Sequence, residues 1–126
     1  MPQQNLNSAW RSRKGCHFEQ LALQWLEARG LRLVQRNYRC KLGEIDLVMR
    51  EGELLVFVEV RFRSRNSQVP ACETVDHRKQ QKLLRTARHF LLCYPTLAAL
   101  PCRFDVLGIN SGPNQPLYDW IRNAFC

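Results

Sequence analysis

The sequence predicts an α/β fold in which helices flank a mixed central β-sheet. Three observations point to it: a helical repeat of apolar residues near the N-terminus, three successive segments with strand-like alternation, and a second helical pattern followed by one more strand. A meander of strands followed by a helix and a further strand is typical of a mixed sheet covered by helices. The 126 residues suit one domain, and 45% hydrophobic with 24% charged residues is ordinary for a globular chain.

The N-terminal part is predicted to be an arm followed by a helix. Residues 1–14 are polar and basic and are expected to form a flexible arm, which leaves residues 15–126 as a single domain. A helix is expected over Gly15–Arg29, ending at Gly30, because apolar residues recur at helical spacing on one face. That face consists of Phe18, Leu21, Ala22, Trp25 and Leu26.

Three strands are expected next, over Leu31–Arg39, Glu44–Arg50 and Leu54–Arg63. The second and third alternate apolar and polar residues with a period of two, as half-buried strands do. A turn at residues 41–43 joins the first two strands, and a short hairpin at Glu51-Gly52 joins the second and third.

The C-terminal half is predicted to add a helix and a strand. Residues 64–71 form a polar loop, and a helix starts near Asp76, a candidate N-cap, and ends before Pro95. A fourth strand is expected over Arg103–Ile109. Leu117–Phe125 is consistent with either a strand or a helix, and this alternative stays open.

Charge and cysteine content restrict the partner and the compartment. The net charge of +8 suits a polyanion such as nucleic acid, because phosphate contacts release counterions, although a basic protein without that role has the same composition. Six cysteines without a C-x-x-C pair, behind a polar N-terminus, predict reduced thiols in the cytoplasm. No apolar run reaches the length of a membrane span, so no membrane partner is expected.

The predicted hairpin brings two carboxylates together. With a two-residue turn at Glu51-Gly52, the apolar residues of both strands share one face of the sheet. The acidic and basic residues Glu44, Asp46, Glu59, Arg61 and Arg63 then share the other face. In this register Asp46 and Glu59 are diagonal neighbours, with Cα atoms about 7–8 Å apart.

Two explanations account for these carboxylates. Two like charges on a largely apolar strand pair are costly, and a hard cation such as Mg²⁺ or Mn²⁺ relieves the cost through oxygen ligands. Alternatively, Asp46 and Glu59 pair with Arg39, Arg61 or Arg63 in a polar cluster. The spacing alone leaves both explanations open.

The motifs around the carboxylates resemble the YraN-like family of small bacterial proteins, described as distant relatives of archaeal Holliday-junction resolvases in the PD-(D/E)xK nuclease superfamily. The matching segments are Gly43-Glu44-Ile45-Asp46-Leu47-Val48, Val56-Phe57-Val58-Glu59-Val60-Arg61, Gly15 with Glu19, Arg78-Lys79-Gln80 and Arg103-Phe104-Asp105-Val106. The resemblance implies a restriction-endonuclease-like fold (α-β-β-β-α-β) and makes residues 15–126 a nuclease-like domain.

The resemblance also implies roles for individual residues. Asp46 and Glu59 match the metal-binding and catalytic acids, and Glu19 matches a first-helix glutamate that assists the metal, although it also suits the flank of an amphipathic helix. Arg61 stands where the superfamily usually has Lys, and it is expected to hold a phosphate because guanidinium does not act as a base. Gln80 is expected near the metal, as polar residues of this helix are in related nucleases.

Basic residues predict a nucleic-acid surface. Positions on the second helix follow helical spacing and form either a phosphate-contacting face or an ordinary solvated face. The residues expected to contact phosphate are Arg61, Arg63, Arg78, Lys79, Lys82 and Arg85.

Three functions follow from the sequence. The first is a nucleic-acid-binding, Mg²⁺- or Mn²⁺-dependent endonuclease acting on DNA, with branched or damaged DNA as the substrate class. The second is a DNA-binding protein of the same fold with weak or no cleavage, which Arg61 favours. The third is a protein-interaction module with an acidic partner. Junction resolvases commonly act as dimers, so a homodimer is also expected.

Overall fold

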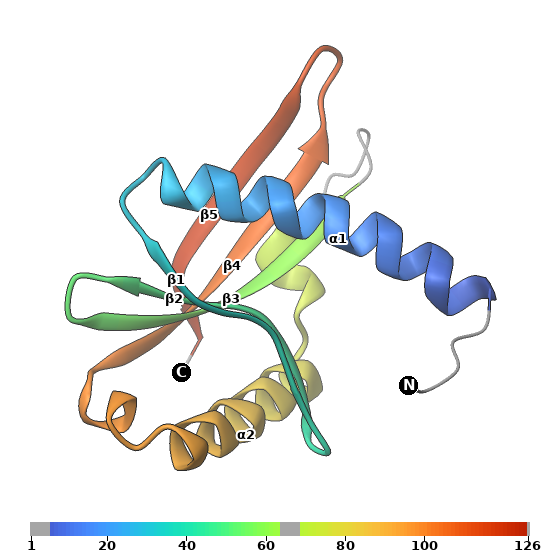
Figure 1. The fold of residues 1–126 in the computed structure, drawn as a ribbon. Helices are drawn as coiled ribbons and strands as arrows, with labels where there is room; N and C mark the ends of the chain where they lie inside the picture. The colour runs from blue at the N-terminus through green and yellow to red at the C-terminus, as the bar shows by residue number, and fades with distance from the viewer. Residues whose placement is uncertain (1–5, 64–68, 126) are drawn as a thin grey trace.

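The computed structural model describes residues 6–63 and 69–125, and these form five strands, two α-helices and two short 3-10 helices (Figure 1). The elements follow the order helix, three strands, helix, two strands. Their bounds are α1 Leu6–Glu27, β1 Arg32–Cys40, β2 Gly43–Glu51, β3 Leu54–Arg63, η1 Ala71–Thr74, α2 His77–Cys93, η2 Leu97–Ala99, β4 Cys102–Ser111 and β5 Pro116–Phe125.

The five strands form one mixed sheet in the order β1-β2-β3-β4-β5. β3 and β4 are parallel, and the other neighbouring pairs are antiparallel. The parallel pair requires a crossover, which η1 and α2 provide. The expected fold class is confirmed: this is a restriction-endonuclease-like α/β fold with a mixed sheet flanked by helices.

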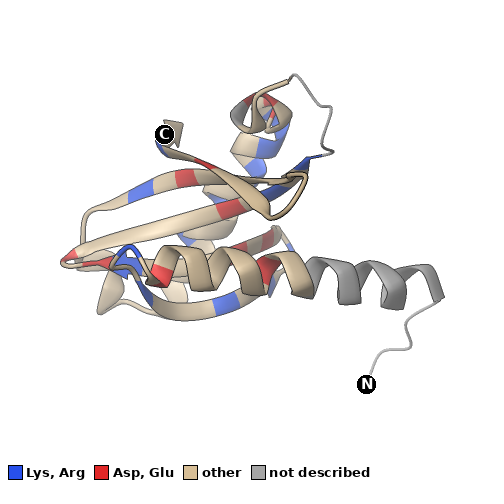
Figure 2. Cartoon of the chain, turned by 90° about the horizontal axis from the view of Figure 1, so that it is seen from above, with Lys and Arg blue, Asp and Glu red and all other residues tan. Residues whose placement is uncertain are grey.

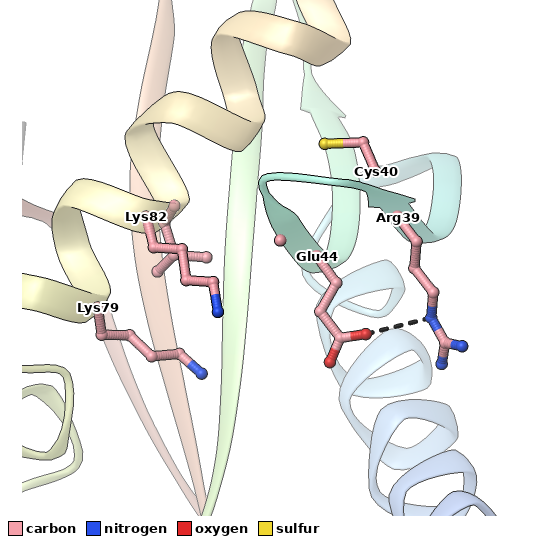
Figure 3. Close-up of a pocket in the computed structure, with 7 residues that line it drawn as sticks. Arg39, Cys40, Glu44, Lys79 and Lys82 are labelled. Atoms are coloured by element: carbon pink, nitrogen blue, oxygen red, sulfur yellow. Dashed lines mark ion pairs between the residues drawn. The ribbon is translucent and has the colours of Figure 1, made fainter.

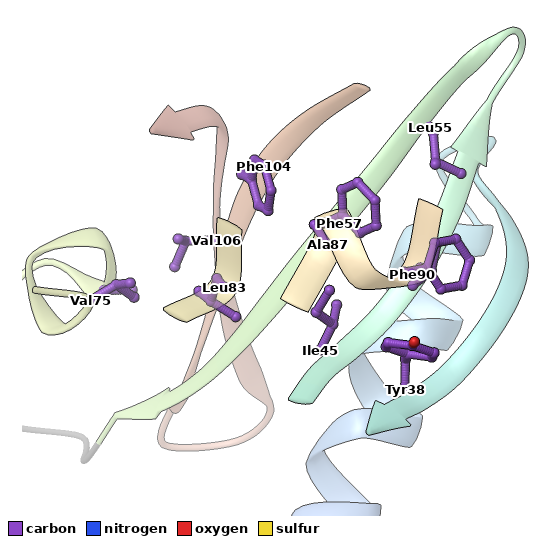
Figure 4. Close-up of a cluster of buried hydrophobic side chains, with 12 residues drawn as sticks. Tyr38, Ile45, Leu55, Phe57, Val75, Leu83, Ala87, Phe90, Phe104 and Val106 are labelled. Atoms are coloured by element: carbon purple, nitrogen blue, oxygen red, sulfur yellow. The ribbon is translucent and has the colours of Figure 1, made fainter. Parts of the chain in front are cut away.

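Each face of the sheet is covered by one helix, with a separate hydrophobic cluster beneath it (Figures 1 and 4). Under α2, the aromatic rings of Tyr38, Phe57 and Phe90 pack together, with Tyr38 and Phe57 each edge-on to Phe90. Under α1, the cluster includes Leu26 of the helix and Met49 of β2, both fully buried. Burial of the middle strands on both faces fixes the sheet between the two helices.

Local signals placed most elements correctly. β3 has the expected bounds, and β1, β2 and β4 differ from the expected bounds by one or two residues at their ends. The carboxylate of Asp76 accepts a hydrogen bond from the backbone N–H of Lys79 at 2.8 Å, which confirms the predicted N-cap of α2. α2 ends at Cys93, before Pro95 as expected.

The two ends of the chain differ from expectation or resolve an open choice. α1 begins at Leu6 rather than near Gly15, so it takes in most of the segment expected to be an arm; residues 1–5 lie outside the described residues. The C-terminal segment, for which strand and helix were both open, forms the edge strand β5. β5 pairs with β4 and completes the sheet.

The predicted register of the β2–β3 hairpin is wrong by one pair. Glu51 lies opposite Leu54 and Arg50 opposite Leu55, so the turn residues are Gly52 and Glu53 rather than Glu51 and Gly52. Gly52 has φ 61°, a conformation that costs glycine little, and it occupies the first turn position. The shift is even, so it preserves which residues of the two strands share a face.

The predicted division into one apolar and one polar face is also wrong. Leu55 and Phe57 of β3 lie in the cluster under α2, while Val56 and Val58 lie in the cluster under α1. Both faces of the strand are apolar because both are covered by helices. The α2 face becomes polar only further along β3, from Glu59 onward, which is where the candidate site lies.

β2 is irregular at the same level of the sheet. Ile45 lies in the cluster under α2, whereas Leu47 and Met49 lie in the cluster under α1, although strict alternation would put all three together. Asn37 of the neighbouring strand has φ 51°, which is uncommon for a residue with a side chain. The distortion flanks Asp46.

Candidate functional site

The candidate site is built where β2 separates from β3. Their ladder ends at the pair Leu47–Val58, and the next residue pair in this register is Asp46 and Glu59. Instead of a backbone partner, the N–H of Val60 donates to Oδ2 of Asp46 at 2.8 Å. The β2–β3 ladder therefore stops just before the two acids, and their carboxyl groups are close enough to share a hydrogen bond.

The ionisation of Asp46 is strongly disfavoured. Burial and then the negative charge of Glu59 raise the pKa of Asp46 well above its ordinary value, and the hydrogen bond from Val60 only partly offsets them. A hydrogen bond between the two carboxyl groups and the charge of Glu19 act in the same direction as burial. The described residues provide no ion pair to Asp46.

Glu59 has the opposite environment. Its side chain is 7% exposed, and Oε2 accepts from two cations: Nζ of Lys79 at 3.1 Å and Nη1 of Arg61 at 3.3 Å. Lys79 comes from the first turn of α2, so the start of that helix is held against β3. Glu59 therefore pairs with cations, as the alternative explanation of a polar cluster predicts, whereas Asp46 does not.

Arg61 is mainly bound to the segment before α2. Its Nε donates to Oγ1 of Thr74 at 2.9 Å, and its Nη2 donates to the carbonyl of Thr74 at 3.1 Å. Thr74 in turn donates to the carbonyl of Ala71 at 2.6 Å, which closes η1. Arg61 shares the site with Glu59 as predicted, but most of its contacts hold η1 on β3.

Glu19 lies at the edge of the site and is half-buried. Burial raises the pKa of Glu19, while a hydrogen bond from Asn37 and the charge of Arg36 lower it. Its Oε1 is buried and has no hydrogen-bond partner in the structure. A buried carboxylate oxygen without a donor is costly, so it favours a ligand or an ordered water at this position.

The acidic residues do not form a complete cage. Within residues 6–63 and 69–125, no group of three or more His, Cys, Asp and Glu side chains is arranged to hold a metal ion. Asp46 interacts electrostatically with both Glu59 and Glu19, but only Glu59 is close enough to share a hydrogen bond with it. This donor set fits Mg²⁺ or Mn²⁺, which bind through one or two carboxylates and keep several waters, better than an ion that needs many protein ligands.

The remaining predicted residues fall into three groups. Arg78 and Arg85 are exposed on α2. Gln80 donates to the carbonyl of Val75 at 3.0 Å and supports the start of α2. Arg63 follows Arg61 on β3 and lines a shallow pocket with residues of β4 and β5.

Glu44 and Lys82 line another pocket from opposite sides. Glu44 forms an ion pair with Arg39 at 3.1 Å, so Arg39 does not serve the carboxylate pair. Lys82 is exposed on α2 and lines the same pocket. Figure 2 shows basic and acidic positions interspersed over strands and helices.

Sequence reasoning assigned Lys79 to phosphate and overlooked its ion pair with Glu59. The signal was present: the Asp76 N-cap fixes where α2 starts and therefore where residue 79 projects. The role of Thr74 had no such signal, because it depends on η1 packing against β3. In the described part of the chain no helix is long and apolar enough to cross a membrane, and Cys40, Cys93 and Cys102 are free thiols.

Fold and site together define a small restriction-endonuclease-like α/β protein with two opposed carboxylates at the end of its central hairpin. The family described as uncharacterised protein family UPF0102 matches residues 18–109, and the chain belongs to this family, the YraN family expected from its motifs. The matched range includes Glu19, Asp46, Glu59, Lys79 and Lys82.

Relatives match over most of their length. A UPF0102 protein of Aeromonas hydrophila is 54% identical over 113 residues, which cover 89% of this chain and 84% of the relative. A UPF0102 protein of Alcanivorax borkumensis is 47% identical over 118 residues, with 91% and 94% covered. One of Stutzerimonas stutzeri is 50% identical over 107 residues, with 85% and 89% covered.

Proposed function

We propose that the protein binds DNA and cleaves it as an Mg²⁺- or Mn²⁺-dependent endonuclease, with Asp46 and Glu59 holding the metal. One observation carries the proposal: Asp46 is opposed to a second carboxylate and its pKa is raised well above the ordinary value, yet no cation of the described chain pairs with it. A divalent ion supplies the missing positive charge. Burial of such a pair without a cation is costly, and sites of this kind are commonly functional.

Each side chain of the site has a distinct task in this proposal. Asp46 and Glu59 would hold the ion, and the unpartnered Oε1 of Glu19 is the third carboxylate oxygen that would assist it. The bound ion supplies a Lewis acid that polarises a phosphoryl oxygen and lowers the pKa of a bound water. Lys79, 42% exposed, lies between Glu59 and solvent, so its ammonium can donate to a phosphate oxygen next to the carboxylates.

Arg61 serves the site by positioning in this proposal. Two of its three hydrogen bonds go to Thr74, so it keeps η1, and with it the start of α2, in place against β3. A guanidinium has five N–H donors, and its remaining donors can still reach a phosphate. Guanidinium does not lose a proton at working pH, so it does not act as the base.

The test is a cleavage assay on end-labelled single-stranded, duplex and four-way-junction DNA, each with Mg²⁺, Mn²⁺ or EDTA. Cleavage that requires metal and is lost in Asp46→Asn, purified in the same way, supports the proposal. The variant also controls for a contaminating nuclease. Metal-independent binding without cleavage of any substrate overturns the endonuclease and leaves the second candidate, a DNA-binding protein of this fold, which the Thr74 contacts of Arg61 favour.

A further inference from the structure

A pocket of about 300 Å³ lies beside the carboxylate pair, between the turn that joins β1 to β2 and the first turns of α2 (Figure 3). Arg39 and Glu44 line it from the hairpin, and Lys79 and Lys82 line it from the helix. In Figure 3 both lysine side chains extend from α2 toward the hairpin side. We call this space the hairpin pocket.

The hairpin pocket has one cation left over. Arg39 pairs with Glu44 at 3.1 Å, and Lys79 pairs with Glu59 at 3.1 Å. Lys82 forms no ion pair with any carboxylate of the described residues. The ammonium of Lys82 is therefore available to an anion that enters the pocket.

The fold itself places Lys82 in this position. A Cβ atom added to Gly43 would come within 3.3 Å of Cγ and Cε of Lys82 and within 2.8 Å of Oγ1 of Thr86. The backbone of the hairpin turn thus packs directly on the aliphatic stem of Lys82. Gly43 has φ 150°, a conformation that favours glycine, so the sequence of the turn supports this close approach.

Lys79 links the hairpin pocket to the carboxylate pair. Lys79 lines the pocket and also contacts Glu59, so one side chain borders both spaces. Lys79 and Lys82 are three positions apart on α2, which puts their Cβ atoms about 5–6 Å apart on one side of the helix. Two cations at this spacing can contact successive phosphates of one strand.

We propose that the hairpin pocket binds the nucleotide next to the one at the carboxylate pair, with its phosphate on Lys82. The inference rests on the proposed function for the location of the reacting phosphate. A pocket of about 300 Å³ is at the lower end of the size range of small-ligand sites and suits one nucleotide unit. It is too small for duplex DNA, whose major groove alone is about 12 Å wide. The preferred substrate class is therefore a strand with an unpaired nucleotide beside the cleavage position.

A binding experiment without metal tests the pocket independently of cleavage. The probe is thymidine 3′,5′-bisphosphate, titrated in EDTA by calorimetry and by amide chemical shifts. Wild type is expected to bind with shifts at Gly43 and Lys82, and Lys82→Gln is expected to weaken binding roughly tenfold because it removes one charge-assisted phosphate contact. The matched control is Arg88→Gln, which removes the same charge from an exposed position of the same helix that is not among the predicted phosphate contacts, and it should change affinity less than twofold.

A second arm uses DNA with one unpaired terminal nucleotide and the same duplex with a blunt end. Lys82→Gln should weaken the overhang DNA several-fold more than the blunt duplex. Equal losses for Lys82→Gln and Arg88→Gln, or an effect of Lys82→Gln on the bisphosphate alone, would overturn the proposal. If the protein cleaves no substrate but shows the loss specific to Lys82→Gln, the pocket proposal holds and the endonuclease proposal fails. Melting temperatures check that both variants are folded.

Discussion

Replacing Arg61 by Ala tests whether this arginine holds the fold of the site or a phosphate. The substitution removes the hydrogen bonds to Oγ1 and the carbonyl of Thr74, at 2.9 and 3.1 Å, and one of the two cations on the buried Glu59. Each hydrogen bond contributes about 1 kcal/mol. The ion pair adds at most about 1 kcal/mol, because the Arg61 side chain is 29% exposed and solvent screens its charge. The expected loss is about 2–3 kcal/mol in the free energy of unfolding.

For a chain of 126 residues this loss lowers the melting temperature by roughly 8–12 °C. Circular dichroism melts and urea titrations measure it, and DNA affinity is measured on the same samples below the transition. Arg61→Lys is expected to recover only part of the stability, because one ammonium cannot reach both Thr74 acceptors and Glu59 in the same way. Arg88→Ala, at an exposed arginine outside the predicted phosphate contacts, is the control for loss of charge. If Arg61→Ala melts like Arg88→Ala while its DNA affinity falls tenfold, the positioning role is refuted and the phosphate clamp stands.

Three further predictions concern the rest of the molecule. Asp46→Asn should abolish Mn²⁺ binding in calorimetry. Because the folded-state pKa of Asp46 is raised, wild type should lose stability as the pH rises from the ordinary aspartate range through that raised pKa. Melts recorded across pH should show this loss for wild type and not for the variant. Lys82→Gln should reduce the slope of log affinity for DNA against log salt by about one, whereas an unchanged slope would exclude a phosphate contact. Asp105→Ala should destabilise the fold by about 3 kcal/mol in urea titrations without altering metal binding, since it leaves the donors of Arg103, Trp120 and Asn123 without their buried acceptor.

The parts of the fold that sequence predicted best are those set by local pattern. β3 follows a clear turn signal and carries an apolar residue at every second position. Its bounds were predicted correctly as Leu54–Arg63. The Asp76 N-cap and Pro95 likewise bounded α2, because capping and proline act within one helical turn. The family resemblance added what periodicity could not, namely the restriction-endonuclease-like class.

The errors came from choices that depend on neighbouring elements. Turns at Glu51-Gly52 and at Gly52-Glu53 are both compatible with the sequence. The structure has the second, with Gly52 at its first position in a positive-φ conformation. Ile45 changes face beside Asn37 of β1, which has a positive φ, whereas the register shift between β1 and β2 lies between Leu33 and Gln35. Neither feature has a signature within a single strand. The true register differs from the predicted one by an even number of residues, so both place Asp46 and Glu59 on the same face. The proximity of the two carboxylates was therefore predicted despite the wrong register.

The distribution of cations explains why the two carboxylates are not equivalent. Arg61 and Lys79 both contact Oε2 of Glu59, whereas Asp46 accepts the neutral N–H of Val60 and has no cation among the described residues. A cluster selected for stability alone would place one cation on each acid, because an unpaired buried carboxylate costs more than a second cation on one acid returns. The structure instead leaves the positive charge missing at Asp46, and the unpartnered oxygen of Glu19 lies on the same edge of the site. If Asp46 and Glu59 hold a divalent cation as proposed, the ion would supply the positive charge that Asp46 lacks among the described residues. Lys79, 42% exposed beside Glu59, would then lie next to the bound ion and be placed to donate to a phosphate oxygen.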